Sequence, residues 1–259
     1  MAWKMAAMSM SMRLPQTRRF TEIDFLMIAI WASFLLVFVN RKPFGFMAWA
    51  IAGGGLMIVQ HLYNVCYKGQ KSEGNLVIAA LTLIFQSLSG AVLGLINAWT
   101  PVTYDAQLAK LDMGIAPAVR AWTEAHVTVN LLLNTVYSAL PFMLLLCAMS
   151  LSGRNRVRLV YSIVVAGILV VPCYLIFPAV GPIHAGDPNA DRNCMPSMHL
   201  TWALLMFINS KGVMKYITGV FAILTAAATL SMGEHYVLDL IAALPWTGLI
   251  TVVSRKLAK

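Results

Sequence analysis

Two short motifs near the carboxyl end of the chain carry the side chains best suited to chemistry. The first spans residues 194–199 (Cys-Met-Pro-Ser-Met-His), and the second spans residues 235–239 (His-Tyr-Val-Leu-Asp). Both lie at the ends of hydrophobic segments, where ionisable groups are costly and are most often functional. An imidazole with one free nitrogen is a nucleophile toward phosphorus, and a carboxylate bonded to its other nitrogen fixes the tautomer.

The spacing of the second motif predicts how its two ends cooperate. Residues four positions apart on a helix share a face, so His235 and Asp239 can meet if the last helix begins near the histidine. A leaving oxygen also needs a proton donor, and His199 fits because imidazole titrates near neutral pH. Ser197 and the amides that follow Pro196 begin a predicted helix and are candidates for binding phosphoryl oxygens.

Other polar residues allow more than one interpretation. Arg192, five residues before Ser197, is a candidate phosphate-binding residue, and equally a loop charge that pairs with Asp187 or Asp191. His61 lies within an apolar span and is interpreted as a packing residue. His126 and His184 are interpreted as solvated loop residues, and His184 can also line the entrance to the site. Spacing alone assigns no role to Asp105, Asp112 or Arg120.

The composition identifies the class of protein. Of 259 residues 59% are hydrophobic and 11% are charged, with a mean hydropathy of +0.75. Soluble domains carry about a quarter charged residues, so the chain is expected to cross a membrane several times. The net charge of +9 lies mostly in short loops, which indicates membrane topology and not nucleic-acid binding. The four cysteines have no C-x-x-C spacing, and only Cys194 is suspected of lining a site.

Hydrophobic segments of about 20 residues predict an all-α bundle of about eight transmembrane helices. The expected spans are 22–39, 44–64, 75–97, 128–149, 157–177, 196–210, 213–231 and 236–254. The segment 104–120 predicts one or two short interfacial helices. We expect a cytoplasmic tail at residues 1–21 and two accessory helices at 22–74. A six-helix catalytic domain at 75–254 and a second cytoplasmic tail at 255–259 follow.

The distribution of Lys and Arg predicts the orientation of these spans. Fourteen of the 19 basic residues lie in the tails or in loops on the side of the tails, so both termini are expected in the cytoplasm. The loops 178–195 and 232–235 then share the opposite face with the long connection 98–127. The two histidine motifs are therefore expected to converge at the non-cytoplasmic interface.

The motifs resemble those of a known family. The Pro-Ser-Met-His string at 196–199 and the His-x-x-x-Asp string at 235–239 resemble two signature motifs of the type 2 phosphatidic acid phosphatase superfamily. Phe-Pro-x-x-Gly-Pro at 177–182 and His-Tyr-x-x-Asp look most like the branch of inositol phosphorylceramide and sphingomyelin synthases. The segment 104–114 also resembles an upstream segment of that branch. The resemblance covers about residues 75–254.

The resemblance implies a mechanism without metal or cofactor. His235 would form a phosphohistidine, Asp239 would orient it, His199 would protonate the leaving group and Ser197 would hold a phosphoryl oxygen. Two basic family motifs that neutralise a terminal phosphate are missing. No Lys-x6-Arg-Pro string occurs, and Ala228-Thr229 stands where phosphatases have Ser-Arg.

These departures favour a phospholipid headgroup transferase, with a lipid substrate and a lipid hydroxyl or water as the acceptor. A phosphatase acting on phosphatidic acid or a polyprenyl phosphate is the alternative. A proton-coupled transporter represents a different class, which predicts ionisable residues along a path through the bilayer.

Overall fold

The computed structural model describes residues 92–257 apart from positions 94 and 152. All regular structure in this part of the chain is helical, which confirms the predicted all-α class. The helices are α4 (Asp105–Asp112), α5 (Ile115–Glu124), α6 (Val127–Ser138), α7 (Leu140–Ser150), α8 (Gly153–Ile176), the 3-10 turn η1 (Pro182–His184), α9 (Met198–Asn209), α10 (Gly212–Ser231) and α11 (Val237–Leu257).

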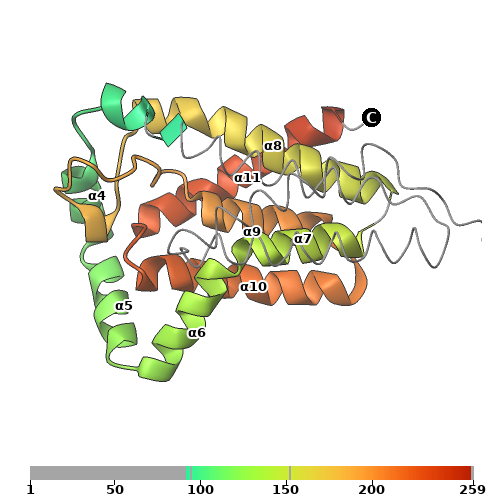
Figure 1. Cartoon of the computed structure of the whole chain (residues 1–259), viewed down its shortest axis with the longest axis horizontal. Helices are drawn as coiled ribbons and strands as arrows, with labels where there is room; N and C mark the ends of the chain where they lie inside the picture. Colours follow the sequence, from blue (N-terminus) through green and yellow to red (C-terminus); the bar gives the residue numbers. More distant parts are fainter. Residues whose placement is uncertain (1–91, 94, 152, 258–259) are drawn as a thin grey trace, which may run out of the picture.

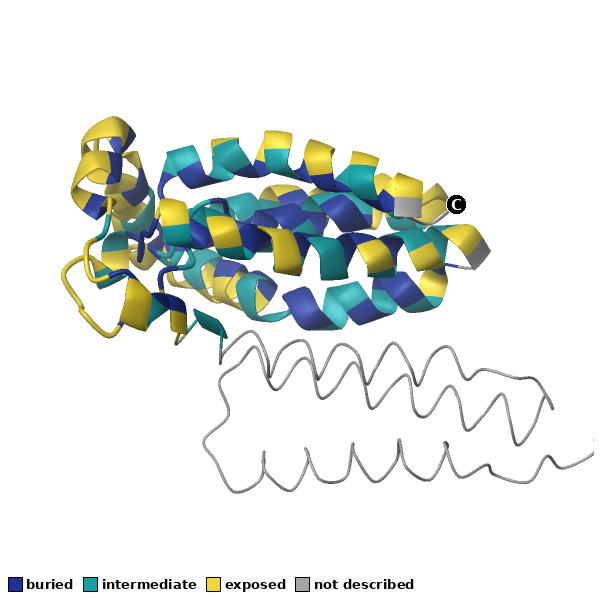
Figure 2. Ribbon diagram, turned by 90° about the horizontal axis from the view of Figure 1, so that it is seen from above, coloured by how far each residue is buried: buried dark blue, intermediate teal, exposed yellow. Residues whose placement is uncertain are grey.

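Helix α9 forms the centre of the bundle. It packs against α7, α8, α10 and α11, and these helices run roughly along the long axis of the molecule (Figure 1). Ala203, Leu205 and Met206 of α9 have no exposed surface. Figure 2 shows that buried residues gather where the helices face one another. Helices of apolar sequence throughout are typically enclosed in this way.

Within the described residues, three helices are long and apolar enough to cross a membrane: Arg154–Ile176 within α8, Gly212–Ser231 (α10) and Val237–Lys256 within α11. The pair α6 and α7 adds a fourth span if its members are counted together, although they meet at 56°. These helices agree with the predicted spans 157–177, 213–231 and 236–254. The predicted span 128–149 is thus a bent pair of helices and not one straight helix.

The predicted span 196–210 is present as α9, which begins two residues later and ends one residue earlier than predicted. Helix α9 has 12 residues, about 18 Å at 1.5 Å per residue, and a membrane core is about 30 Å thick. The helix starts after Ser197, whose side chain accepts a hydrogen bond from the amide of Leu200, and it ends before Ser210 and Lys211. The neighbouring helices α7, α8, α10 and α11 pack against it.

The remaining predicted spans fall on a part of the chain without a structural description. The tail 1–21, the two accessory helices and most of 75–97 lie outside the described residues, so the predicted domain boundaries and the total of eight spans stay predictions. The connection 98–127 contains the two short helices α4 and α5, as expected. They lie at one end of the bundle, where the loops before α9 and α11 also meet (Figure 1).

Candidate active site

Backbone hydrogen bonds join the two histidine motifs. The amide of Ser197 donates to the carbonyl of Asp239 at 3.2 Å, and the amide of Ile183 donates to the carbonyl of Gly233 at 2.9 Å. Gly181 makes this approach possible, because a Cβ atom there would lie 2.2 Å from the carbonyl oxygen of Glu234. Its φ of +89° also favours glycine. The loop before α9 and the turn before α11 therefore form one unit.

His235, Asp239 and Cys194 form a buried cluster. The Nδ1 atom of His235 lies 3.5 Å from Oδ2 of Asp239, so the predicted i, i+4 pair does come together although His235 precedes α11. The Cys194 thiol donates to the same Oδ2 at 2.7 Å and lies 3.4 Å from Nδ1. The amide of Tyr236 also donates to Oδ2, at 2.7 Å. One carboxylate oxygen is thus shared by an imidazole, a thiol and an amide.

Cys194 is a hydrogen-bond donor in this cluster. Burial, followed by the neighbouring Asp239 carboxylate, raises the pKa of the Cys194 thiol well above its ordinary 9.0. The thiol therefore stays protonated at neutral pH and supplies its proton to Asp239. This position agrees with the prediction that Cys194 lies beside a site. Its direct contact with Asp239 could not be predicted from local sequence, since 45 positions separate the two residues.

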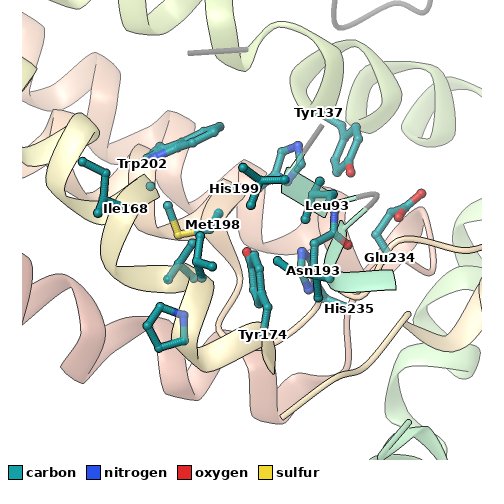
Figure 3. A pocket seen from close by; sticks show the side chains of 16 residues that line it. Leu93, Tyr137, Ile168, Tyr174, Asn193, Met198, His199, Trp202, Glu234 and His235 are labelled. Atoms are coloured by element: carbon teal, nitrogen blue, oxygen red, sulfur yellow. The ribbon is translucent and has the colours of Figure 1, made fainter. Parts of the chain in front are cut away.

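His199 faces the cluster from the start of α9. Its ring centroid lies 6.3 Å from that of His235, with the two planes at 65°. The ring of Tyr137 from α6 stacks on His199 at 4.2 Å and 18°, and the two lie side by side in Figure 3. Stacking of this kind limits rotation of the imidazole. The convergence of the two histidines, expected from topology, is therefore present.

Both histidines line a cavity of about 700 Å³. Trp202 and Ile168 lie at the end opposite Glu234 (Figure 3). No Lys or Arg is among the described residues that line the cavity, and most of its wall is apolar. The lining residues are Val92, Leu93, Ile96, Tyr137, Gly167, Ile168, Val170, Val171, Pro172, Tyr174, Asn193, Met198, His199, Trp202, Glu234 and His235.

Ser197 and Arg192 do not line this cavity. Ser197 is fully buried and caps α9. The Arg192 guanidinium is buried and donates to carbonyl oxygens of Thr100, Pro188 and Ala190 and to the side chain of Asn97. No ion pair joins it to Asp187 or Asp191 in the described part of the chain, and its visible role is to brace the loop. The assignment of both residues to phosphate binding stays a prediction.

Two aspartates of α4, to which sequence spacing assigned no role, hold the motif loops. The Asp105 carboxylate accepts hydrogen bonds from the amides of Val180 and Gly181 and from the Tyr236 hydroxyl, at 3.0–3.2 Å. Burial and this carboxylate raise the pKa of Tyr236, so the phenol remains a donor. Asp105 thereby connects both motif loops to α4.

Asp112 connects the beginnings of two helices. Its Oδ2 accepts a hydrogen bond from the amide of Ala116 in α5 at 2.8 Å, and its Oδ1 accepts one from the amide of Val237 in α11 at 2.9 Å. A carboxylate at a helix amino terminus satisfies free amides and favours the helix dipole. Asp112 therefore fixes where α11 starts, two residues after His235.

Three further residues named in the sequence analysis, His184, Arg120 and His126, lie outside the buried cluster. His184 lies 3.6 Å from the carboxylate of Glu234, a cavity-lining residue that sequence analysis did not single out. Arg120 lies against the turn at Gly233 and donates to Glu124 at 2.8 Å. His126 is exposed at the start of α6 and bonds to the carbonyl of Trp122, consistent with a solvated loop residue.

Comparison with known families supports a class for this site. Residues 184–253 match the model of the PAP2 superfamily, and this stretch contains both histidine motifs and Cys194. The match supports a lipid phosphatase or phosphotransferase kind of function for the chain. The membrane-length helices agree with that class. No curated protein and no solved structure matches the chain.

Proposed function

We propose that the protein is a membrane phosphoryl-transfer enzyme that moves a phospholipid headgroup to a lipid hydroxyl. The observation that carries the proposal is the position of two imidazoles, His199 and His235, at a mostly apolar cavity. A lipid tail fits the apolar wall, and the ester phosphorus then lies against the histidines. Helix α8, which is of membrane length, forms part of the cavity wall, and this suits access from the bilayer.

The proposed reaction has two steps. The Nε2 lone pair of His235 attacks phosphorus, the bond from phosphorus to the leaving oxygen breaks, and His199 gives a proton to that oxygen. Asp239 stabilises the positive charge that develops on His235. In the second step His199 takes the proton of an acceptor hydroxyl, the new oxygen–phosphorus bond forms, and the bond to His235 breaks. The pair of histidines returns to its starting protonation.

The charge of the cavity supports a phosphodiester substrate. The described lining residues include Glu234 but no Lys or Arg, and the Arg192 guanidinium already donates to oxygen atoms of its own loop and of Thr100. A phosphomonoester dianion needs nearby cations, whereas a diester has a single negative charge. The two basic family motifs that are missing from the sequence agree with this preference. This favours the headgroup transferase branch.

A lipid phosphate phosphatase is the second candidate. The family match itself favours it, because the superfamily is named for phosphatases. Water would replace the lipid hydroxyl in the second step, and the first step would be unchanged.

A panel of lipids presented to the purified protein tests the proposal. The panel holds phosphatidic acid, polyprenyl phosphate, phosphatidylinositol, ceramide and diacylglycerol, and mass spectrometry and a phosphate assay identify the products. We expect a headgroup transferred between lipids, and complete loss of transfer in His235→Ala. His126→Ala is the matched control, because this histidine is exposed and does not line the cavity. Free phosphate in place of transfer would establish the phosphatase.

A second substrate separates the two histidine roles. An aryl phosphodiester has a leaving group that needs little protonation, so His199→Ala should retain more activity on it than on a phospholipid, while His235→Ala should be inactive on both. Acid-labile phosphate on His235 in the native protein would identify the intermediate. Turnover retained in His235→Ala would exclude this mechanism.

A further inference from the structure

We propose that Cys194, His235 and Asp239 form an inhibitory binding site for Zn²⁺ or another thiophilic divalent cation. One potential ligand atom of each residue lies within 4.8 Å of the others. Thiolate, imidazole and carboxylate are the three ligand types that zinc prefers in proteins. Sequence spacing did not indicate such a site, because Cys194 lies about 40 positions before the other two residues.

The distances within the cluster are close to those of a zinc site. Tetrahedral zinc with ordinary bond lengths separates its ligand atoms by about 3.3–3.6 Å. The Sγ–Nδ1 and Nδ1–Oδ2 distances are 3.4 and 3.5 Å. Only the distance from Sγ to Oδ2, 2.7 Å, is shorter, and it must widen by about 0.8 Å to reach that range. Loss of the thiol proton removes the hydrogen bond that holds these two atoms together.

The carboxylate has a second oxygen available to a cation. Asp239 is fully buried, and its Oδ1 has no hydrogen-bond partner among the described residues. A buried carboxylate oxygen without a donor is unfavourable, and coordination of a cation would satisfy it. His235 lines the cavity, which gives a cation a route to the cluster.

Coordination at Nδ1 would stop the proposed reaction, so the inhibitory effect rests on the proposed function. A neutral imidazole carries one proton. During attack that proton is on Nδ1, facing Asp239, and the lone pair is on Nε2. Zinc on Nδ1 moves the proton to Nε2 through water, and the nucleophilic lone pair is lost. The Cys194 thiol proton is released to solvent as the zinc–sulfur bond forms, with no change of oxidation state.

Cobalt binding tests the site without any assay of activity. Co²⁺ bound to a thiolate absorbs in the near ultraviolet, and one cobalt per protein with this band is expected in the native protein. The band should persist in His199→Ala, which keeps all three ligands, and disappear in Cys194→Ser. A band that survives in Cys194→Ser, or is absent from the native protein, would overturn the site.

Inhibition tests the functional part. Zn²⁺ should inhibit the native enzyme, EDTA should reverse the effect, and Mg²⁺ should have none because it avoids thiolate ligands. Each protein is compared with its own zinc-free rate. Half-inhibition of Cys194→Ser should need a zinc concentration more than about 10-fold higher than that of the native enzyme, because loss of even a residue that hydrogen-bonds to a metal ligand lowers metal affinity about 10-fold. Equal inhibition of both proteins would refute the proposal.

The cobalt-binding and inhibition experiments together separate failure of the metal site from failure of the proposed function. Cobalt bound through Cys194 in a protein that is inactive on every lipid would leave the site standing and refute the proposed function. An active protein that binds no cobalt would do the reverse.

Discussion

Asp239 is the residue on which the other groups of the site depend. Its carboxylate has no exposed surface, and its Oδ2 accepts hydrogen bonds from the Cys194 thiol and the Tyr236 amide beside the His235 ring. A buried carboxylate is stable only when donors surround it. The same donors hold the oxygen in place for the imidazole, so the stability of the anion and the orientation of His235 have a common cause.

Asp239→Asn tests the role of this charge. The amide keeps the size of the side chain but cannot stabilise a positive imidazole, so kcat/KM should fall by about 10²–10⁴-fold. Steady-state kinetics on an aryl phosphodiester measures the effect. The control is Asp187→Asn, since Asp187 lies exposed in the loop before α9. A decrease smaller than about 3-fold would contradict the orienting role.

The raised pKa of Cys194 predicts a dependence of stability on pH. The folded protein favours the protonated thiol, whereas in the unfolded chain the thiol ionises near its ordinary pKa of 9.0. Its contribution to stability is therefore present below about pH 9 and is lost as the pH rises above that value. Apparent melting temperatures between pH 7 and 10 should fall less for Cys194→Ser than for the native protein. Parallel declines would contradict this prediction.

At the scale of the elements, the site is built where loops meet short helices. Helix α4 supplies Asp105 and Asp112. They accept hydrogen bonds from the Tyr236 hydroxyl and the Val237 amide, which follow His235, and from the amides of the loop at Gly181. The last turn before α11 thus has its position determined by a helix that lies about 125 residues earlier in the chain. Small displacements of these loops are expected to affect chemistry more than packing.

Gly181→Ala tests this close approach, and Gly186→Ala is its matched control. Both glycines have positive φ, +89° and +92°, so each substitution introduces similar backbone strain. Only at Gly181 would the new Cβ collide with the carbonyl of Glu234, the residue before His235. Gly181→Ala should therefore lose most activity and about 1–3 kcal/mol more stability than Gly186→Ala. Lipid turnover and thermal unfolding measure the difference, and equal behaviour would contradict the assignment.

At the scale of the whole molecule, the two histidines of the candidate site and a wall of apolar side chains line the same cavity. The cavity joins the histidines to the apolar faces of α8 and α9, including Gly167 and Trp202. Helix α8, which is of membrane length, forms part of the cavity wall. In the proposed reaction, lipid chains and the reacting phosphate would therefore occupy one continuous space.

Gly167→Leu tests whether the cavity holds a lipid chain. The added side chain would fill part of the apolar wall, so KM for long-chain phospholipids should rise by about 10-fold, while a short aryl phosphodiester should react normally. Gly248→Leu is the control, because Gly248 is exposed on α11 with open space around it. Equal effects on both substrates would indicate damage to the site and not to a chain-binding wall.

The sequence by itself determined the membrane class, the positions of α8, α10 and α11, and the approach of His235 to Asp239. Hydrophobic length and i, i+4 spacing are local properties, so they can be read without a fold. Only the tertiary structure decided that Cys194 meets Asp239, that Tyr137 stacks on His199 and that Arg192 turns toward Asn97 and Thr100. These contacts join residues distant in the chain, and their geometry depends on how helices pack around α9. The bend between α6 and α7 also depends on tertiary packing, since local hydropathy does not show which neighbours surround a helix.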